Sequence, residues 1–190
     1  MKYPNGLKKE YVNIKSHSNR GMNLENDLND TNSYYLNNDI AIIYKKPTPI
    51  TISKVDFKSR KDAVIKEAHF KIPSTTDYNG IYKGKYIDFE AKETKNLTNF
   101  PINNIHKHQI EHLEKIYKHG GIGFIIIRFS KLNKTYLLFI EDLIVFLDNN
   151  TRASIPIVYF NEKAYIIKEG IFPRIDYLKV LDEKGVLFYE

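Results

Sequence analysis

The chain has 190 residues, 42% of them hydrophobic, which is enough for one domain with a substantial core. Its formal net charge of +6 favours a polyanionic partner such as nucleic acid, and the absence of cysteine excludes disulfides and thiolate zinc sites. The most apolar run, residues 122–127, is too short to span a bilayer, and the first six residues lack the apolar core of a signal peptide. We therefore expect a cytoplasmic protein that does not bind a membrane.

The first part of the chain divides into a polar arm and a helix. Residues 1–18 are polar and basic, and we expect a flexible arm ahead of a single domain over residues 19–190. Apolar residues at helical spacing predict a helix from Met22 to about Leu36. Arg20 and Glu25 border this helix. They are either ordinary surface groups or, beside a phosphate-cleaving site, a phosphate contact and a side chain that orients the site.

A buried strand is predicted at Ile40–Tyr44, and a long two-stranded projection follows it. Over residues 50–71, apolar residues alternate on both sides of a basic turn, as expected for a hairpin. Its basic side chains are suited to phosphate contacts; the candidates are Lys58, Arg60, Lys61 and Lys66. The alternative is a solvated hairpin without a partner.

A β-hairpin from Asp77 to Thr94 is the centre of the functional hypothesis. Side chains alternate along a strand, so Asp88, Glu90 and Lys92 share one face, which we expect to be in contact with solvent. With Asp77 upstream, the pattern Asp…(Asp/Glu)-x-Lys is typical of metal-dependent phosphodiesterases. In such sites carboxylates bind Mg²⁺ or Mn²⁺, and a lysine stabilises the developing negative charge. The same residues also fit a charged outer strand face without a catalytic role.

A helix is predicted over residues 103–119, with Gln109 in the middle of its apolar face. A buried amide needs a partner, so Gln109 is either a satisfied core residue or a side chain that reaches a site under the sheet. The same helix contains His108, Glu111 and His112 in the H-x-x-E-H spacing of inverted zinc peptidases. We expect these three on the flank of the helix, in solvent, because Gln109 occupies the inward position.

The rest of the chain predicts the second half of the sheet. A continuous apolar run at residues 122–129 indicates a buried central strand. The further elements are a strand at 134–140, a short helix at 141–147, a polar loop at 148–163, a short strand at 164–168, and a strand or helix at 173–181.

Seven segments carry a resemblance to a known family: Ser18–Met22, Lys45–Pro49, Ala63–Ala68, Ser74–Gly84, Tyr86–Lys95, His108–His112 and Pro173–Tyr177. They closely resemble RecU-type Holliday junction resolvases, from about residue 18 to residue 178. The resemblance implies an α/β fold of the restriction-endonuclease-like type. Its mixed sheet would be flanked by helices, and the 50–71 projection would be a stalk that enters the junction.

The resemblance also implies an activity and a set of site residues. It predicts a homodimer that nicks opposing strands of four-way DNA junctions with Mg²⁺, and contacts with the recombinase RecA and the branch-migration motor RuvB. By position, Thr75, Asp77, Glu90 and Gln109 would bind the metal, and Lys92 would stabilise the transition state. Asp88 and Glu25 remain accessory candidates. Two alternatives stay open: a branched-DNA-binding protein without catalysis, and another nuclease on the same fold.

Overall fold

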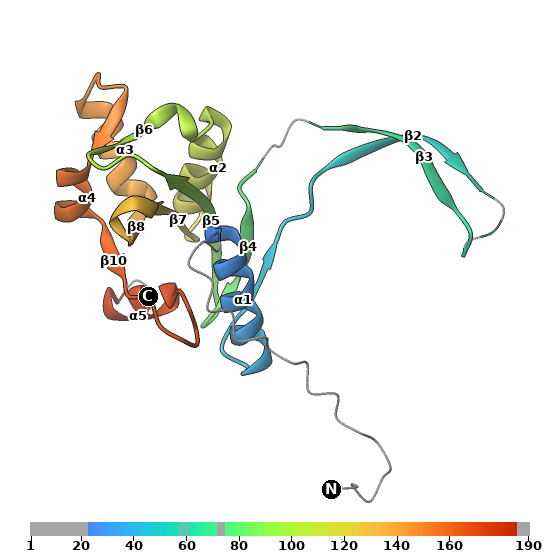
Figure 1. The fold of residues 1–190 in the computed structure, drawn as a ribbon, viewed down its shortest axis with the longest axis horizontal. Helices are drawn as coiled ribbons and strands as arrows, with labels where there is room; N and C mark the ends of the chain where they lie inside the picture. Colours follow the sequence, from blue (N-terminus) through green and yellow to red (C-terminus); the bar gives the residue numbers. More distant parts are fainter. Residues whose placement is uncertain (1–22, 58, 60, 72–74, 186–190) are drawn as a thin grey trace, which may run out of the picture.

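The computed structural model describes residues 23–57, 59, 61–71 and 75–185, and its core is a six-stranded mixed sheet (Figure 1). The strand order is β1-β4-β5-β7-β8-β10. The strands are β1 (Ile42–Lys45), β4 (Tyr78–Tyr82), β5 (Lys85–Thr94), β7 (Ile122–Phe129), β8 (Lys134–Phe139) and β10 (Tyr165–Ile167). Neighbouring strands are antiparallel except β5 and β7, which run parallel at the centre.

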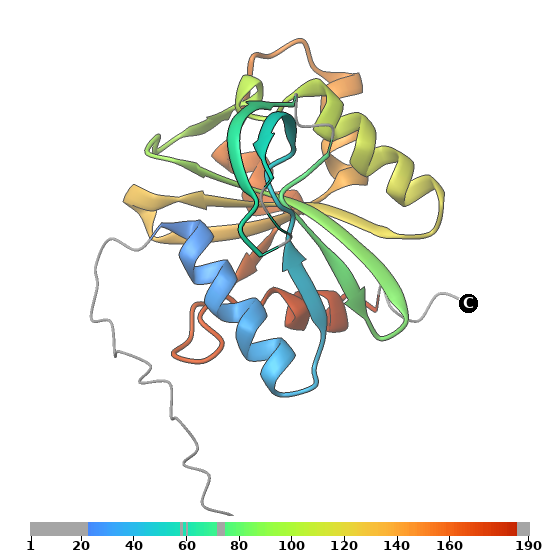
Figure 2. The same ribbon diagram turned by 90° about the vertical axis from the view of Figure 1, so that its right-hand side faces the viewer.

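Helices cover both faces of this sheet, which lies between them in Figure 2. One face packs against α1 (Leu24–Asn37) and α5 (Tyr177–Glu183). The other packs against α2 (Lys107–Lys118), α3 (Ile140–Asn149) and α4 (Ile157–Lys163). Two 3₁₀ turns, η1 (Ile102–Asn104) and η2 (Ser130–Leu132), and a small sheet of β6 (Asn99–Pro101) with β9 (Ser154–Pro156) complete the body. No helix in the described ranges is both long and apolar enough to cross a membrane.

The central strand β7 explains why the sheet has two cores. All eight of its residues are buried, because alternate side chains enter the α1/α5 core and the α2/α3/α4 core. The prediction of a buried central strand at residues 122–129 is confirmed. Strand β1 differs from its prediction: Ile43 is buried, but Ile42 and Tyr44 are 54% and 56% exposed. The reason is that β1 lies at the edge of the sheet and packs on α1 with one face alone.

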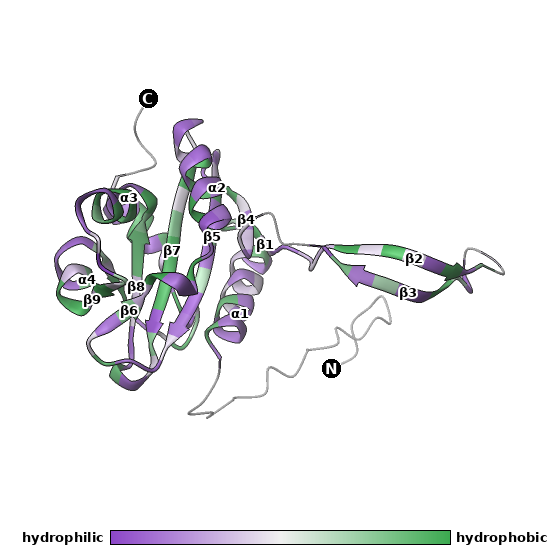
Figure 3. Ribbon diagram, turned by 90° about the horizontal axis from the view of Figure 1, so that it is seen from above, coloured by the Kyte–Doolittle hydropathy of each residue, from purple (hydrophilic) through white to green (hydrophobic). Residues whose placement is uncertain are grey.

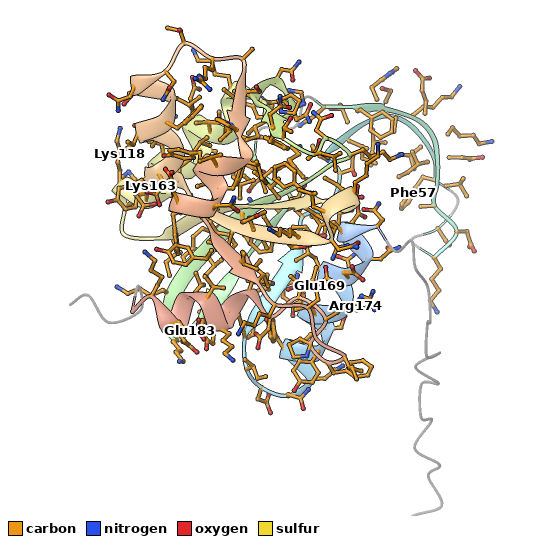
Figure 4. The ribbon with its side chains drawn as sticks, turned by 60° about the vertical axis from the view of Figure 1, so that its left-hand side comes forward. Phe57, Lys118, Lys163, Glu169, Arg174 and Glu183 are labelled. Atoms are coloured by element: carbon orange, nitrogen blue, oxygen red, sulfur yellow. The ribbon has the colours of Figure 1, made fainter. Side chains whose placement is uncertain are left out.

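The stalk is a separate two-stranded antiparallel sheet, β2 (Ile50–Asp56) with β3 (Val64–Phe70). It projects from the body, and hydrophobic and hydrophilic residues alternate along it (Figures 1 and 3). Every residue of both strands is exposed, and Phe57 at the far end of β2 is 67% exposed (Figure 4). The prediction of a two-stranded projection over residues 50–71 is confirmed.

Buried ion pairs hold α1 on the sheet. Asp27 of α1 lies 2.6 Å from Arg128 of β7 and 2.7 Å from Arg174, and Arg128 also pairs with Glu169 at 3.2 Å. Figure 4 shows Glu169 and Arg174 beside α1. The first turn of α1 is therefore fixed to the end of the sheet that carries the candidate site.

The region 148–163 is more ordered than the predicted polar loop, because β9 and α4 lie within it. Ile155 and Phe160 are completely buried and anchor both elements. The predicted mixed-sheet α/β core flanked by helices, with a protruding stalk, is the architecture that the structure has.

Candidate active site

The β4–β5 hairpin brings the two predicted acids together. Lys83 and Gly84 both have positive φ angles, 47° and 77°, which allow the tight turn between the strands. The register pairs Tyr78 with Phe89, so Asp77, one residue before β4, lies opposite Glu90. The Asp77 backbone N–H donates a hydrogen bond of 3.1 Å to Glu90 Oε2.

Glu90 and Lys92 lie on the same face of β5, as the alternation predicts. Lys92 Nζ is 2.6 Å from Glu90 Oε1. The expectation that this face is in solvent is wrong: Asp88 and Glu90 are completely buried, and the Lys92 side chain is 22% exposed. The physical reason is that β5 lies inside the sheet and α2 packs over the face that carries these side chains.

Glu90 is a carboxyl group whose ionised form is disfavoured in the metal-free protein. Burial, followed by the nearby charge of Asp77, raises the pKa of Glu90 to about 7, although Lys92 acts in the opposite direction. Glu90 Oε1 accepts no hydrogen bond of good geometry within the described residues, despite the short ion-pair distance to Lys92. A bound cation would favour the ionised carboxylate of Glu90.

The residues present fit a hard cation such as Mg²⁺. Asp77 and Glu90 supply carboxylate oxygens on neighbouring strands. Within the described ranges there is no group of three or more His, Cys, Asp and Glu side chains that could hold a metal ion. Mg²⁺ is usually bound in proteins through one or two carboxylates and keeps several waters, which matches the pair Asp77 and Glu90.

Thr75 and Gln109 are the two other predicted ligands. Thr75 is partly exposed and precedes Asp77 by two residues. Gln109 is 5% exposed in the first turn of α2, and its Oε1 accepts a hydrogen bond of 3.0 Å from the His106 backbone N–H. The inward position predicted for Gln109 is confirmed. Its amide caps the helix, and the carbonyl oxygen keeps a second lone pair for another partner.

Glu25 of α1 lines a pocket together with Asp77 and Lys92 of the candidate site. This small pocket of about 80 Å³ is lined by residues that include Glu25, Asp77, Lys92 and Glu93. Glu25 also forms an ion pair with Lys45 of β1. Glu93 is a lining residue that sequence reasoning missed, and it accepts a hydrogen bond of 3.3 Å from the backbone N–H of Leu24.

Asp88 is not a surface neighbour but the centre of a buried polar cluster. Its carboxylate contacts Lys46, Thr76, Tyr86 and His112. Sequence reasoning missed these four. Only Tyr86 could have been found, because it lies two residues from Asp88 on the same strand face.

The histidine pattern on α2 does not form a zinc site in the described part of the chain. Glu111 is directed to Lys107 at 3.3 Å on the helix surface, whereas His112 Nε2 lies 3.2 Å from Asp88 Oδ2. The expectation that the histidines are solvated flank residues is wrong for His112, whose side chain is 23% exposed and points to the buried cluster. It is also wrong for His108, which is partly buried and whose Nε2 is removed from solvent. His108 stacks on the ring of His106, with centroids 5.4 Å apart.

The predicted DNA-contacting residues are described in part. Lys61 is exposed near the stalk tip, and Lys66 of β3 is exposed and forms an ion pair of 3.3 Å with Asp56. The candidates Arg20, Lys58 and Arg60 and the arm over residues 1–18 lie outside the described residues.

The family model and the curated relatives that match this chain carry the same family description. Residues 19–183 match the family RecU, recombination protein U. "Holliday junction resolvase RecU" of Bacillus mycoides (strain KBAB4) is 52% identical over 193 residues, covering 96% of each chain. The protein with the same description from Bacillus cytotoxicus is 51% identical with the same coverage. A structure of the Holliday junction resolvase Hjc of Archaeoglobus fulgidus is a remote likeness, with 13% identity, a TM-score of 0.38, and coverage of 82% of this chain and 95% of that one. The chain described here belongs to the RecU family of recombination proteins.

Proposed function

We propose that this protein is a Holliday junction resolvase, a metal-dependent endonuclease that nicks opposing strands of four-way DNA junctions during recombination and repair. The observation that carries the proposal is Glu90, a buried carboxylate held between Asp77 and Lys92 with one oxygen free of good hydrogen bonds. The description of relatives that are about half identical over nearly the whole chain supports the same activity.

Each residue of the site has a defined task in this proposal. Asp77 and Glu90 hold Mg²⁺, or Mn²⁺ in its place, and Thr75 and Gln109 add uncharged oxygens beside them. A metal held by these residues would supply an activated water and would offset negative charge on the scissile phosphate. Lys92, held beside Glu90 at 2.6 Å, places a positive charge where negative charge develops. Glu90 is completely buried, and removal of its carboxyl group from bulk water strengthens these electrostatic effects.

The stalk supports a branched substrate. Its exposed lysines, with Lys61 near the tip and Lys66 on β3, lie far from the site and are suited to the phosphates of DNA arms. Contacts of this kind read the shape of a junction rather than its bases. A duplex nuclease would have no evident need for such a projection.

Assembly and location belong to the same proposal. Two related nicks require two active sites, so we propose a homodimer with two-fold symmetry. We place the enzyme in the cytoplasm, where bacterial chromosomal DNA lies. Contacts with the recombinase RecA and the motor RuvB remain expectations from the family resemblance, and co-sedimentation with each purified partner would test them.

The decisive test is a nicking assay on a synthetic four-way junction with Mg²⁺, with EDTA, and with Asp77→Ala. Asp182→Ala is the control, because Asp182 accepts hydrogen bonds from Tyr82 and Lys83 and does not line the pocket of the site. We expect nicking by the wild type and the control in Mg²⁺ alone. Cutting in EDTA, or full activity of Asp77→Ala, would refute the site. Junction binding by the wild type without cleavage would favour a non-catalytic accessory protein.

A further inference from the structure

The two buried carboxylates of β5, Asp88 and Glu90, differ in the number of polar groups that contact them. Asp88 is completely buried and has four polar contacts: Lys46 Nζ at 2.8 Å, Tyr86 Oη at 2.9 Å, His112 Nε2 at 3.2 Å, and the Thr76 hydroxyl. A carboxylate removed from water is tolerated when it is paired and hydrogen-bonded, and Asp88 meets this condition. Both oxygens of Asp88 already have protein partners, three contacts at Oδ2 and one at Oδ1.

The partners of Asp88 come from the segments that carry the proposed metal ligands. Thr76 lies between Thr75 and Asp77 in the chain. Lys46 holds the same segment twice, because its Nζ donates to Thr76 Oγ1 at 2.9 Å and its backbone N–H donates to the Asp77 carbonyl at 2.7 Å. The approach to β4 is thus fixed by side-chain and backbone contacts that converge on Asp88.

The contact of His112 extends the cluster to α2. His112 lies three residues after Gln109, so the two side chains are neighbours on one side of this helix. A contact between Asp88 and His112 therefore fixes the rotation and height of α2 over β5, and with them the position of Gln109. Glu90 lies two residues after Asp88 on the same face of β5, so the strand itself fixes the position of Glu90 relative to Asp88.

We propose that Asp88 is the positioning residue of the metal site: its carboxylate holds the Thr75–Asp77 segment and α2 at the correct distance from Glu90. This inference rests on the proposed metal-dependent activity. It assigns Asp88 no contact with metal or substrate. It predicts that loss of this carboxylate weakens metal binding in protein that is still folded.

A purely structural role is the alternative, since a broken buried ion pair lowers stability wherever it lies. The test therefore needs a readout that stability alone does not change. Calorimetric titration of the DNA-free protein with Mn²⁺ is such a readout, at a temperature where the unfolding curve shows that each variant is folded.

The main variant is Asp88→Asn, which keeps the shape of the side chain and removes its charge. We expect Mn²⁺ to bind about 10- to 100-fold more weakly, which is the usual effect of losing a group that orients metal ligands. The Mg²⁺ concentration for half-maximal nicking should rise by the same factor. The matched control is Asp176→Asn, because Asp176 is partly buried and, like Asp88, accepts a hydrogen bond from a tyrosine, at 2.8 Å from Tyr35 Oη, on the α1/α5 side of the sheet. Mn²⁺ binding by the control should equal that of the wild type.

A second pair of variants covers the case in which Asp88→Asn does not fold. Lys46→Met removes the main cation of the cluster, and Lys46→Arg retains a positive charge. We expect weaker Mn²⁺ binding by Lys46→Met and partial recovery by Lys46→Arg. If Asp88→Asn or Lys46→Met is folded and binds Mn²⁺ as tightly as the wild type, the proposed positioning role is wrong.

Mn²⁺ binding and nicking by the wild type distinguish a wrong positioning role from a wrong function. If the wild type binds Mn²⁺ and nicks junctions while Asp88→Asn binds Mn²⁺ equally well, the positioning role alone is wrong. If the wild type neither binds Mn²⁺ nor shows metal-dependent nicking, both proposals are wrong.

Discussion

At the scale of single residues, Asp88 and Glu90 show how one strand face serves two purposes. Both side chains are completely buried, and each has one lysine nearby, Lys46 for Asp88 and Lys92 for Glu90. Asp88 has additional hydrogen-bond donors, whereas Glu90 faces a second acid, Asp77. Asp88, with four polar contacts, suits a structural task, and Glu90, beside a second acid, suits a cation.

The charge of Lys92 should matter for cleavage and not for DNA binding. We expect Lys92→Gln to lower the nicking rate about 10²- to 10³-fold, the usual cost of losing one group that stabilises transition-state charge. Junction affinity, measured by gel shift in Ca²⁺, should stay within about threefold, since Lys92 is largely covered by protein. Lys134→Gln, on the exposed first residue of β8, is the control. A rate for Lys92→Gln near that of the control would exclude this role.

The raised pKa of Glu90 predicts a pH dependence of stability in the absence of metal. The folded protein holds the Glu90 proton up to about pH 7, whereas the unfolded chain releases it near 4.5. Between these values the folded state binds more protons, so its stability falls as pH rises. Glu90→Gln cannot ionise and should gain stability over the wild type across this window, by at most about 3 kcal/mol.

Urea unfolding in EDTA at pH 5 and pH 8 measures this effect. Glu183→Gln, on the surface end of α5, serves as the control (Figure 4). We expect the difference between Glu90→Gln and the wild type to grow from pH 5 to pH 8. Two parallel stability profiles would show that Glu90 is not destabilised as an anion.

The sequence predicted the site in part. The pairing of Asp77 with Glu90 followed from the hairpin, and Lys92 followed from strand alternation. The burial of Asp88 and Glu90 could not be predicted, because it depends on α2, whose packing on β5 is a tertiary contact. Lys46 was missed because 42 residues separate it from Asp88, and no local pattern links them.

At the scale of elements, the stalk is held together by strand pairing and has no buried residue. Its projection was predictable, since alternating apolar residues on both sides of a basic turn indicate a hairpin. The strand and helix within residues 148–163 were not predicted. Ile155 and Phe160 lie at the two ends of an apolar run, residues 155–160, which Pro156 interrupts, and both are buried in the core of α2, α3 and α4.

Neutralising the stalk should change the salt dependence of DNA binding. If Lys61 and Lys66 each contact one phosphate, Lys61→Gln with Lys66→Gln should flatten the slope of log K against log salt by about 1.8. Lys118→Gln with Lys163→Gln is the control, on the body of the protein (Figure 4). Lys118 is a good match for Lys66, because both are exposed and paired with one acid. Binding curves for four-way junctions at several salt concentrations give both slopes, and equal slopes would rule out phosphate contacts by these two lysines.

The ion pairs of α1 should contribute strongly to stability. Asp27→Asn leaves the buried Arg128 without its main anion, and loss of one partner of a buried pair costs about 3–5 kcal/mol. Chemical unfolding gives the value directly, with the more exposed Asp182→Asn as the control. A loss below about 1 kcal/mol would mean that α1 is held mainly by its apolar contacts, such as those of Leu24 and Leu28.

At the scale of the whole molecule, the body and the stalk carry different chemical groups. The body carries a buried acidic site at the β4–β5 hairpin, and the stalk extends basic side chains away from it (Figure 1). The described residues of one chain present one such site. In the proposed function, symmetric cleavage of a junction would therefore require two chains, and we propose that their stalks are directed at the branch point.

The proposed activity is metal-dependent, paired cleavage at a branch point by the site of Asp77, Glu90 and Lys92. Its most direct measurement maps the nicks on a four-way junction in which each strand is labelled in turn, with Mg²⁺ and with EDTA. We expect two nicks at related positions in opposing strands, only with Mg²⁺, and none on a linear duplex of the same sequence. Equal cutting of the linear duplex, or nicks that persist in EDTA, would contradict the account.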